Sequence, residues 1–168
     1  PPWHAWGAPR FEASRVRYPA MDVFIIIGNA NTRKSSVVRS LTGCFNRSLR
    51  DIQPAAGGPP RRVYARARAL QFTRTRPADF AAEASATRCD TVLVCLTPDP
   101  NPLDPARLPD AETYLAQFRA VGWKLKSIAV LGQNDGGVRS ARLQRFPQAP
   151  TQPINVTAQA VRAHFGWR

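Results

Sequence analysis

The chain has 168 residues, with 24 lysines and arginines against 11 aspartates and glutamates, and a formal net charge of +13. This length is enough for one domain with a buried core, and a hydrophobic content of 43% excludes a wholly disordered chain. Apolar runs such as 23–27 are far shorter than the roughly 18 residues that a membrane-spanning helix needs. The positive charge favours polyanionic partners such as nucleotides, nucleic acid or acidic membranes, and a solvated basic surface is the alternative.

The cysteine pattern argues against zinc and against a disulfide framework. Cys44, Cys89 and Cys95 are an odd number and have no C-x-x-C spacing. Cys44 and Cys95 are expected to be small buried hydrophobic residues. A basic segment followed by an apolar one, as in a signal peptide, is not found in the sequence. Together these features predict a cytoplasmic protein.

Residues 1–20 differ from the rest of the chain, because they contain four prolines and no periodic apolar pattern. Met21 follows them and is the only methionine. We expect 1–20 to be a disordered N-terminal extension and 21–168 to form a single domain. The alternative is a docking arm that uses Trp3 and Trp6.

Three short apolar runs, 21–27, 91–96 and 127–132, predict strands that are buried on both faces of a parallel sheet. A fourth strand is predicted at 62–72, where valine and alanine alternate with arginine and tyrosine. This alternation indicates a half-exposed strand with a basic outer face. A short last strand is expected at 152–155.

Helices are predicted between these strands, from apolar residues at helical spacing and from residues that start or stop helices. The expected helices are 33–43 with Gly43 as its end, 79–87 preceded by Pro77, 111–121, a short basic helix at 138–145, and 156–165. The proline-rich segment 97–110 is expected to be a long loop. Alternating strands and helices predict an α/β fold, a three-layer open and mostly parallel sheet with helices on both faces.

The loop between the first strand and the first helix carries the most informative motif. Gly28, Lys34 and Ser35 have the spacing of the Walker A P-loop, G-x-x-x-x-G-K-[ST], directly after a strand and before a helix. Residues 21–43 therefore resemble the P-loop NTPase superfamily. Beyond residue 43, up to about residue 165, only the order of strands and helices is similar.

The resemblance implies a site for ATP and Mg²⁺. Backbone N–H groups of the loop and the helix N-terminus would surround the phosphates. Lys34 would reach the β- and γ-phosphates as a catalytic residue, and the Ser35 hydroxyl would bind the metal. The implied nucleotide-binding residues are Gly28, Asn29, Ala30, Asn31, Thr32, Arg33, Lys34, Ser35 and Ser36.

Arg33 departs from the motif, because it stands where the pattern has its second glycine. Its position beside the first helical turn leads us to expect ordinary helical φ and ψ angles. The side chain is then expected either to point away from the phosphates or to reach across them.

Other candidate site residues follow the second and third buried strands. Asp99 is a candidate second ligand for Mg²⁺, and a turn-forming role in a proline-rich loop is the alternative. Gln133, Asn134 and Asp135 stand where GTPase-like P-loop proteins have NKxD, but without a lysine they do not support guanine recognition. A polar turn is the favoured interpretation there, and Asn155 is similarly ambiguous.

Arg139, Arg142 and Arg145 recur at every third residue. In kinase-like P-loop proteins arginines at a similar point clamp the transferring phosphoryl group, so Arg139 and Arg142 are candidate catalytic residues. A solvated helix face is the alternative. His4 and His164 lack a partner motif for a catalytic triad.

The sequence favours an ATP-binding, Mg²⁺-dependent P-loop protein that hydrolyses ATP or transfers its γ-phosphoryl group, and a kinase-like protein more than a GTPase. A nucleic-acid-binding or partner-binding module on a degenerate P-loop scaffold is the alternative. It would use the arginine-rich segments 33–50 and 61–76 to contact phosphate backbones.

Overall fold

The computed structural model describes residues 18–168, so the predictions for residues 1–17, including Trp3, His4 and Trp6, lie outside it. The described residues form six strands and four helices. In chain order these are β1 (Asp22–Gly28), α2 (Lys34–Thr42), β2 (Arg47–Ile52), β3 (Arg61–Ala69), α3 (Pro77–Ala86), β4 (Thr91–Leu96), α4 (Ala111–Ala120), β5 (Lys124–Leu131), β6 (Leu143–Phe146) and α5 (Ile154–Phe165).

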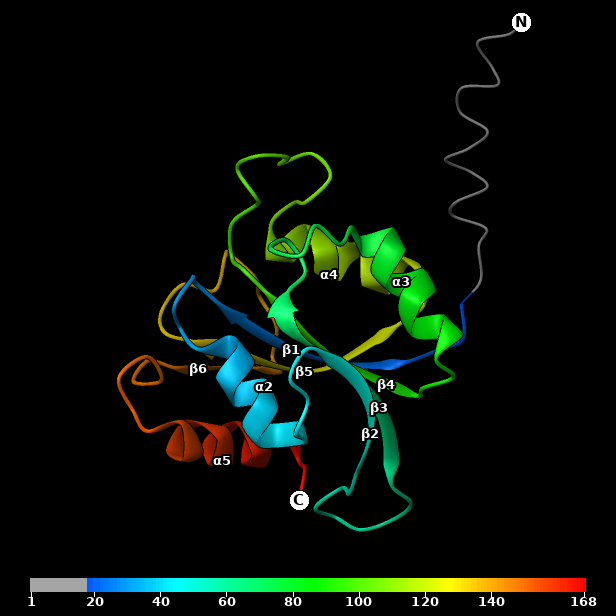
Figure 1. Ribbon diagram of the computed structural model, residues 1–168, viewed down its shortest axis with the longest axis vertical. Helices are drawn as coiled ribbons and strands as arrows, with labels where there is room; N and C mark the ends of the chain where they lie inside the picture. Colours follow the sequence, from blue (N-terminus) through cyan, green and yellow to red (C-terminus); the bar gives the residue numbers. More distant parts are fainter. Residues whose placement is uncertain (1–17) are drawn as a thin grey trace, which may run out of the picture.

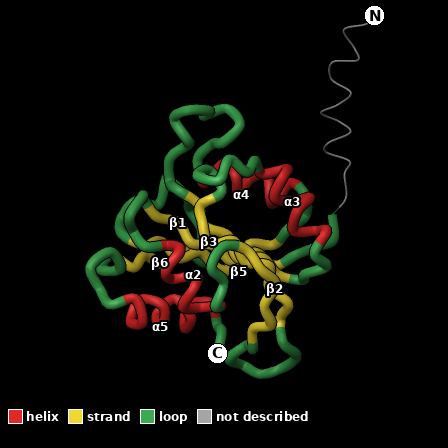
Figure 2. Tube along the Cα trace, in the orientation of Figure 1, coloured by secondary structure: helices red, strands yellow, loops and turns green. Residues whose placement is uncertain are grey.

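The strands build one sheet in the order β2-β3-β4-β1-β5-β6. All neighbouring strands are parallel except β2, which pairs antiparallel with β3 in a hairpin. Helices α3 and α4 cover one face of the sheet, and α2 and α5 cover the other (Figure 1). The predicted three-layer α/β architecture with a mostly parallel sheet is therefore confirmed. Most of the connecting loops lie at the two ends of the strands (Figure 2).

The central strands are apolar throughout because both of their faces are covered. In β1, Val23, Ile25 and Ile27 pack under α3 and α4, whereas Phe24 and Ile26 pack against α2 and α5. Strand β4 alternates in the same way, and all six of its residues are buried. Continuous apolar runs are typical of such central parallel strands. Cys44 and Cys95 are free and buried, as predicted.

Both edges of the sheet differ from the prediction. Residues 47–52 form strand β2, which was not among the predicted strands. The expected helix at 138–145 is wrong, because 143–146 pair in parallel with β5 as strand β6. The expected strand at 152–155 is also wrong, since α5 begins at Ile154. Edge strands are short and carry polar residues on their open sides, so they lack the apolar run that identifies a central strand.

The predicted basic outer face of β3 is also wrong in its central part. Tyr64 and Arg66 are buried, because α3 packs on this face and the Tyr64 ring stacks against Phe80. Arg66 as a whole is 5% exposed, and its guanidinium donates to the Glu83 carboxylate at 2.8 Å. Arg62 and Arg68 remain exposed, so the arginines of β3 do not form a continuous solvent-facing stripe.

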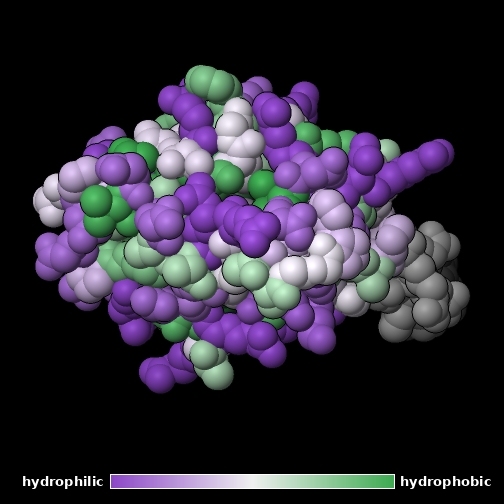
Figure 3. Space-filling view, turned by 90° about the horizontal axis from the view of Figure 1, so that it is seen from below, coloured by the Kyte–Doolittle hydropathy of each residue, from purple (hydrophilic) through white to green (hydrophobic). Residues whose placement is uncertain are grey.

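Within residues 18–168, no helix is long and apolar enough to cross a membrane. Seen from the side of α2 and α5, the surface is mostly hydrophilic and its hydrophobic residues form separate small groups (Figure 3). This face therefore presents no continuous apolar area in that view.

Candidate functional site

The candidate site lies at the carboxyl ends of the central strands. The loop that leaves β1 turns to α2 on one face of the sheet, and the loop that leaves the neighbouring β4 turns to α4 on the other face (Figure 1). Two adjacent strands whose connections separate in this way leave a crevice between them. Open α/β sheets bind ligands at such a crevice.

The β1–α2 loop has a tight backbone. A Cβ atom at Gly28 would lie 2.3 Å from the Thr32 hydroxyl, so glycine makes room for that side chain. The Thr32 hydroxyl and backbone N–H both donate to the carbonyl oxygen of Asn29, at 2.7 and 3.3 Å. Asn31 and Arg33 both have φ of 68°, in the left-handed region. Alternation of left-handed and other conformations turns backbone N–H groups toward the same side, which is a common way to bind an anion.

Arg33 is the position where the prediction of backbone geometry is wrong. Its φ and ψ of 68° and 35° are left-handed and not helical. Glycine adopts this conformation at little cost, which explains the glycine of the Walker A pattern. The Arg33 guanidinium donates to the carbonyl oxygens of Ala149, at 2.6 Å, and Gln152, which precede α5. Of the two predicted orientations, the structure therefore has the side chain bound to a neighbouring loop.

Lys34 is the first residue of α2 and is only 8% exposed. Its ammonium group donates to the carbonyl oxygens of Gly28 and Asn29, at 2.8 and 2.9 Å. Burial lowers the pKa of Lys34, and no carboxylate of the described residues pairs with it. Burial also raises the pKa of the nearby Cys95 thiol to about 12, so this thiol stays neutral. The buried lysine thus has two dipoles but no anion as partners.

The N-terminus of α2 has the same lack of negative charge. Its first turn contains no acidic residue, and Arg33 supplies no side-chain cap. The positive end of the helix dipole and the first backbone N–H groups are therefore available to an anion. Ser35 follows Lys34, and its hydroxyl donates to the carbonyl oxygen of Ala67 in β3 at 2.7 Å. The lone pairs of that hydroxyl remain able to accept or to bind a metal ion.

A cavity of about 410 Å³ lies over this loop and helix end, and we call it the phosphate cavity for the chemistry of its lining. Three of its nine lining residues carry a positive charge, and none of those nine is acidic. The lining residues are Ala30, Asn31, Arg33, Lys34, Ser35, Arg68, Ala69, Phe72 and Thr97. Arg68, at the end of β3, was not among the predicted nucleotide-binding residues, although it belongs to the arginine-rich segment 61–76 of the alternative prediction.

A second cavity of about 430 Å³ adjoins the first and shares Ala30, Phe72 and Thr97 with it. It lies between the turn after β3 and the proline-rich loop after β4. Asp99 is exposed and lines this second cavity, whereas Ser35 lines only the phosphate cavity. The two predicted metal ligands are thus in adjoining cavities. No group of three His, Cys, Asp or Glu side chains within 18–168 is arranged to hold a metal.

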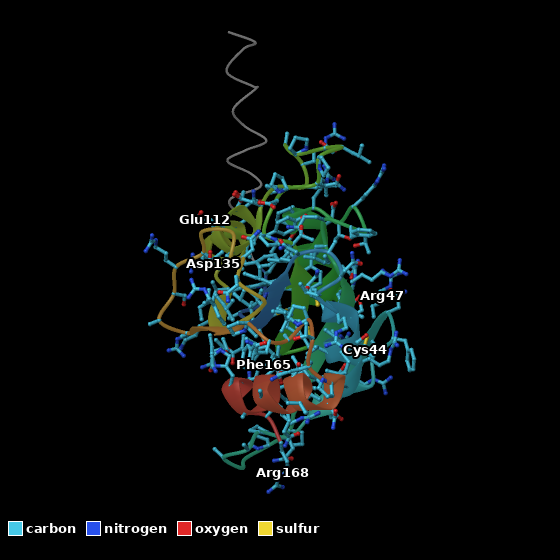
Figure 4. All side chains as sticks on the ribbon, turned by 90° about the vertical axis from the view of Figure 1, so that its left-hand side faces the viewer. Cys44, Arg47, Glu112, Asp135, Phe165 and Arg168 are labelled. Atoms are coloured by element: carbon cyan, nitrogen blue, oxygen red, sulfur yellow. The ribbon has the colours of Figure 1, made fainter. Side chains whose placement is uncertain are left out.

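The loop after β5 closes the edge on its other side. Asn134 donates to the side-chain oxygen of Asn29 at 3.0 Å, which joins this loop to the β1–α2 loop. Gly136 lies so close to Pro98 that a Cβ atom would be 2.8 Å from its carbonyl oxygen. Asp135 pairs with Arg145, and it lies on the same side of Figure 4 as Glu112. Neither Asp135 nor Glu112 lines the phosphate cavity.

The candidate arginines after β5 do not reach the two cavities beside the β1–α2 loop. Arg142 donates to the carbonyl oxygen of Lys126, in the first half of β5, far along that strand from Leu131 and the loop. Arg139 and Arg145 line a separate polar cavity with Asp135. Asn155 is exposed in the first turn of α5, and His164 contacts the carbonyl oxygen of Ile128 at 2.9 Å.

Comparisons with protein families, with curated proteins and with solved structures found no match to this chain. The function must therefore be inferred from the residues and the geometry of the site.

Proposed function

We propose that this protein binds the triphosphate of ATP together with Mg²⁺ in the phosphate cavity, and that it hydrolyses ATP or transfers its γ-phosphoryl group. One observation carries the proposal. The cavity has no acidic lining residue, and it combines the uncapped end of α2, the exposed Arg68 and the buried Lys34, which has no anionic partner among the described residues. A chain of phosphates supplies the negative charge that all of these groups lack.

The polar residues around the cavity fit a metal ion that arrives with the nucleotide. Mg²⁺ usually binds one or two protein oxygens, several waters and the phosphates themselves. The Ser35 hydroxyl offers one such oxygen, and Asp99 in the adjoining cavity is a candidate for contact through water. When bound, the ion neutralises charge on the β- and γ-phosphate oxygens.

The side chains of the cavity have separate tasks in this proposal. Lys34 would exchange its two carbonyl partners for phosphate oxygens, and Arg68 would approach from the end of β3. Arg68 takes the charge-stabilising role for which Arg139 and Arg142 were candidates, since only Arg68 lines the phosphate cavity. Positively charged groups that are already in place stabilise the charge of a transferring phosphoryl group.

A thermal-shift experiment tests this proposal with ATP, GTP and AMP, each with and without Mg²⁺. ATP at 100 times its Kd should add about 2.7 kcal/mol to the free energy of unfolding. For a chain of this size that corresponds to a rise in Tm of roughly 5–10 °C. AMP, which lacks the β- and γ-phosphates, should give a much smaller shift.

Two arginine variants provide a matched pair for the same experiment. Arg68→Ser removes a cation from the phosphate cavity and should reduce the ATP shift. Arg142→Ser removes an exposed arginine near the other end of the sheet and should leave the shift unchanged. Absence of any triphosphate shift in the unmodified protein, or an equal effect of both variants, contradicts the proposal.

A further inference from the structure

The second cavity combines exposed apolar side chains with a fixed frame. Phe72 is 69% exposed and Leu103 is 77% exposed, and both line this cavity. Phe72 lies on the turn after β3, and Leu103 lies on the loop after β4. Large apolar side chains cost free energy when they face water, so a pair of them around one cavity indicates a ligand that covers them.

The two walls of the cavity are joined by a buried amide. Gln71 is 2% exposed, and its side-chain N–H donates to the carbonyl oxygens of Thr97 and Pro109, at 2.9 and 3.2 Å. Its side-chain oxygen accepts from the Thr97 N–H at 3.0 Å. Asn101 donates to the Gln71 carbonyl oxygen, also at 3.0 Å. These four bonds hold the turn after β3 against the loop after β4, so the cavity is largely formed before a ligand binds.

The buried Arg66 holds the turn after β3 in place. The Arg66 guanidinium donates to the Thr73 and Thr75 hydroxyls, at 2.8 and 3.1 Å. Tyr114 donates to the carbonyl oxygen of Thr75 at 2.7 Å. Arg74 lies between the two threonines, with a left-handed φ of 55°, and its exposed side chain lines the cavity. Within the described part of the chain, no carboxylate pairs with Arg74.

We infer that this cavity is a second ligand site, which binds a small molecule with an aromatic or aliphatic body and one anionic group. The body would cover Phe72 and Leu103, and the anionic group would lie opposite Arg74. Asp99, also in the lining, would accept a hydrogen bond from a hydroxyl or amino group of the ligand. A volume of about 430 Å³ is within the usual range for small-molecule sites.

The two cavities share Phe72 and Thr97, so a ligand here would be a direct neighbour of the phosphates. A role of this ligand as phosphoryl acceptor rests on the proposed function. Its binding does not, because Lys34 and the end of α2 line only the phosphate cavity. Ligand binding in the second cavity and triphosphate binding in the phosphate cavity can therefore be disproved independently.

The test uses the full chain and the dye 8-anilinonaphthalene-1-sulfonate, which has aromatic rings, one anionic group and one N–H donor. We expect saturable fluorescence enhancement with one site per chain. Phe72→Ser and Arg74→Ser should each weaken binding at least fivefold. The matched controls lie away from the cavity. Phe45→Ser changes a phenylalanine that is 72% exposed, and Arg88→Ser changes an exposed arginine whose φ is also in the left-handed region. The controls should leave binding unchanged.

Two further experiments test which cavity binds the dye and which chemical groups the cavity recognises. Lys34→Met should keep the dye affinity within twofold. Phenyl phosphate should displace the dye at lower concentration than inorganic phosphate or benzyl alcohol, because only phenyl phosphate satisfies both Phe72 and Arg74. Unchanged near-ultraviolet circular dichroism confirms that the variants are folded. The inference is overturned if Phe72→Ser binds the dye as the unmodified protein does, if Phe45→Ser loses as much affinity, or if Lys34→Met abolishes binding.

Discussion

Within residues 18–168 two cations are almost fully buried, and their surroundings differ. Arg66 is 5% exposed and Lys34 is 8% exposed. Arg66 has the Glu83 carboxylate at 2.8 Å and two threonine hydroxyls as partners. Lys34 has two backbone carbonyl oxygens and no carboxylate among the residues described. One buried charge is thus neutralised by the fold, and the other is not.

Under the proposed function, this difference separates a structural cation from a binding one. A buried charge is costly unless an opposite charge and hydrogen bonds compensate it. Around Arg66 the fold supplies a carboxylate and two hydroxyls, and the residue holds the turn that carries Arg74 at the second cavity. Around Lys34 the missing anion is what a phosphate would bring. Such costs are common at functional sites, and the proposed function would explain this one.

The largest effect is expected at the compensated cation. Glu83→Ala leaves Arg66 buried without its carboxylate, and it also removes the acceptor of the Tyr64 hydroxyl at 2.6 Å. Breaking a buried pair from one side typically costs 3–5 kcal/mol. Because Glu83 is partly exposed, we expect the low end, about 3 kcal/mol, from denaturant unfolding.

The control for this prediction is the pair of changes Arg66→Met and Glu83→Leu together. The double variant removes both charges, so it should lose less free energy of unfolding than Glu83→Ala alone. A loss below about 1 kcal/mol for Glu83→Ala would show that the pair does not stabilise Arg66.

At Lys34 we expect a smaller effect, and we expect it on the affinity for triphosphate and not on the free energy of unfolding. Lys34→Met keeps most of the length of the side chain but removes the ammonium group, so the free protein should be no less stable. Triphosphate affinity should fall at least a hundredfold, which corresponds to about 2.7 kcal/mol. Titration calorimetry with ATP and Mg²⁺ measures the affinity, and denaturant unfolding measures the stability.

Lys124→Met, at an exposed lysine on the first residue of β5, is the matched control and should change neither quantity. If Lys34→Met instead destabilises the free protein and leaves ATP affinity unchanged, Lys34 is structural like Arg66.

The sequence predicted the centre of this fold well and its edges poorly. Runs such as 92–96 are apolar on both faces, as is typical of a covered parallel strand. Strands β2 and β6 are stabilised by pairing with β3 and β5, which no local pattern reveals. The burial of Arg66 was missed for a similar reason, because its carboxylate partner comes from helix α3.

The candidate site was predictable only where it is continuous in sequence. The spacing of Gly28, Lys34 and Ser35 identifies the loop. Arg68, Phe72 and Arg74 line the two cavities from the end of β3 and the turn after it, and they become part of the site only because β3, β4 and β1 end at one edge. The left-handed conformation of Arg33 was missed because an arginine gives no local signal for a positive φ, whereas a glycine does.

Arg33 lies next to Lys34 and, like Lys34, has only carbonyl oxygens as partners among the described residues, but these belong to the loop before α5. Its guanidinium donates to the carbonyl oxygens of Ala149 and Gln152, while its backbone is left-handed. Arg33→Ala loses these bonds and keeps the unfavourable backbone. Arg33→Gly loses the same bonds but relieves the backbone, so it should be more stable than Arg33→Ala by about 1 kcal/mol in denaturant unfolding.

Both variants should bind ATP within a fewfold of the unmodified protein, since Lys34 and the end of α2 are unchanged. Equal stability of the two variants would argue against the left-handed backbone. A tenfold loss of ATP affinity in both, about 1.4 kcal/mol, would assign Arg33 to the phosphates and remove the distinction between it and Lys34.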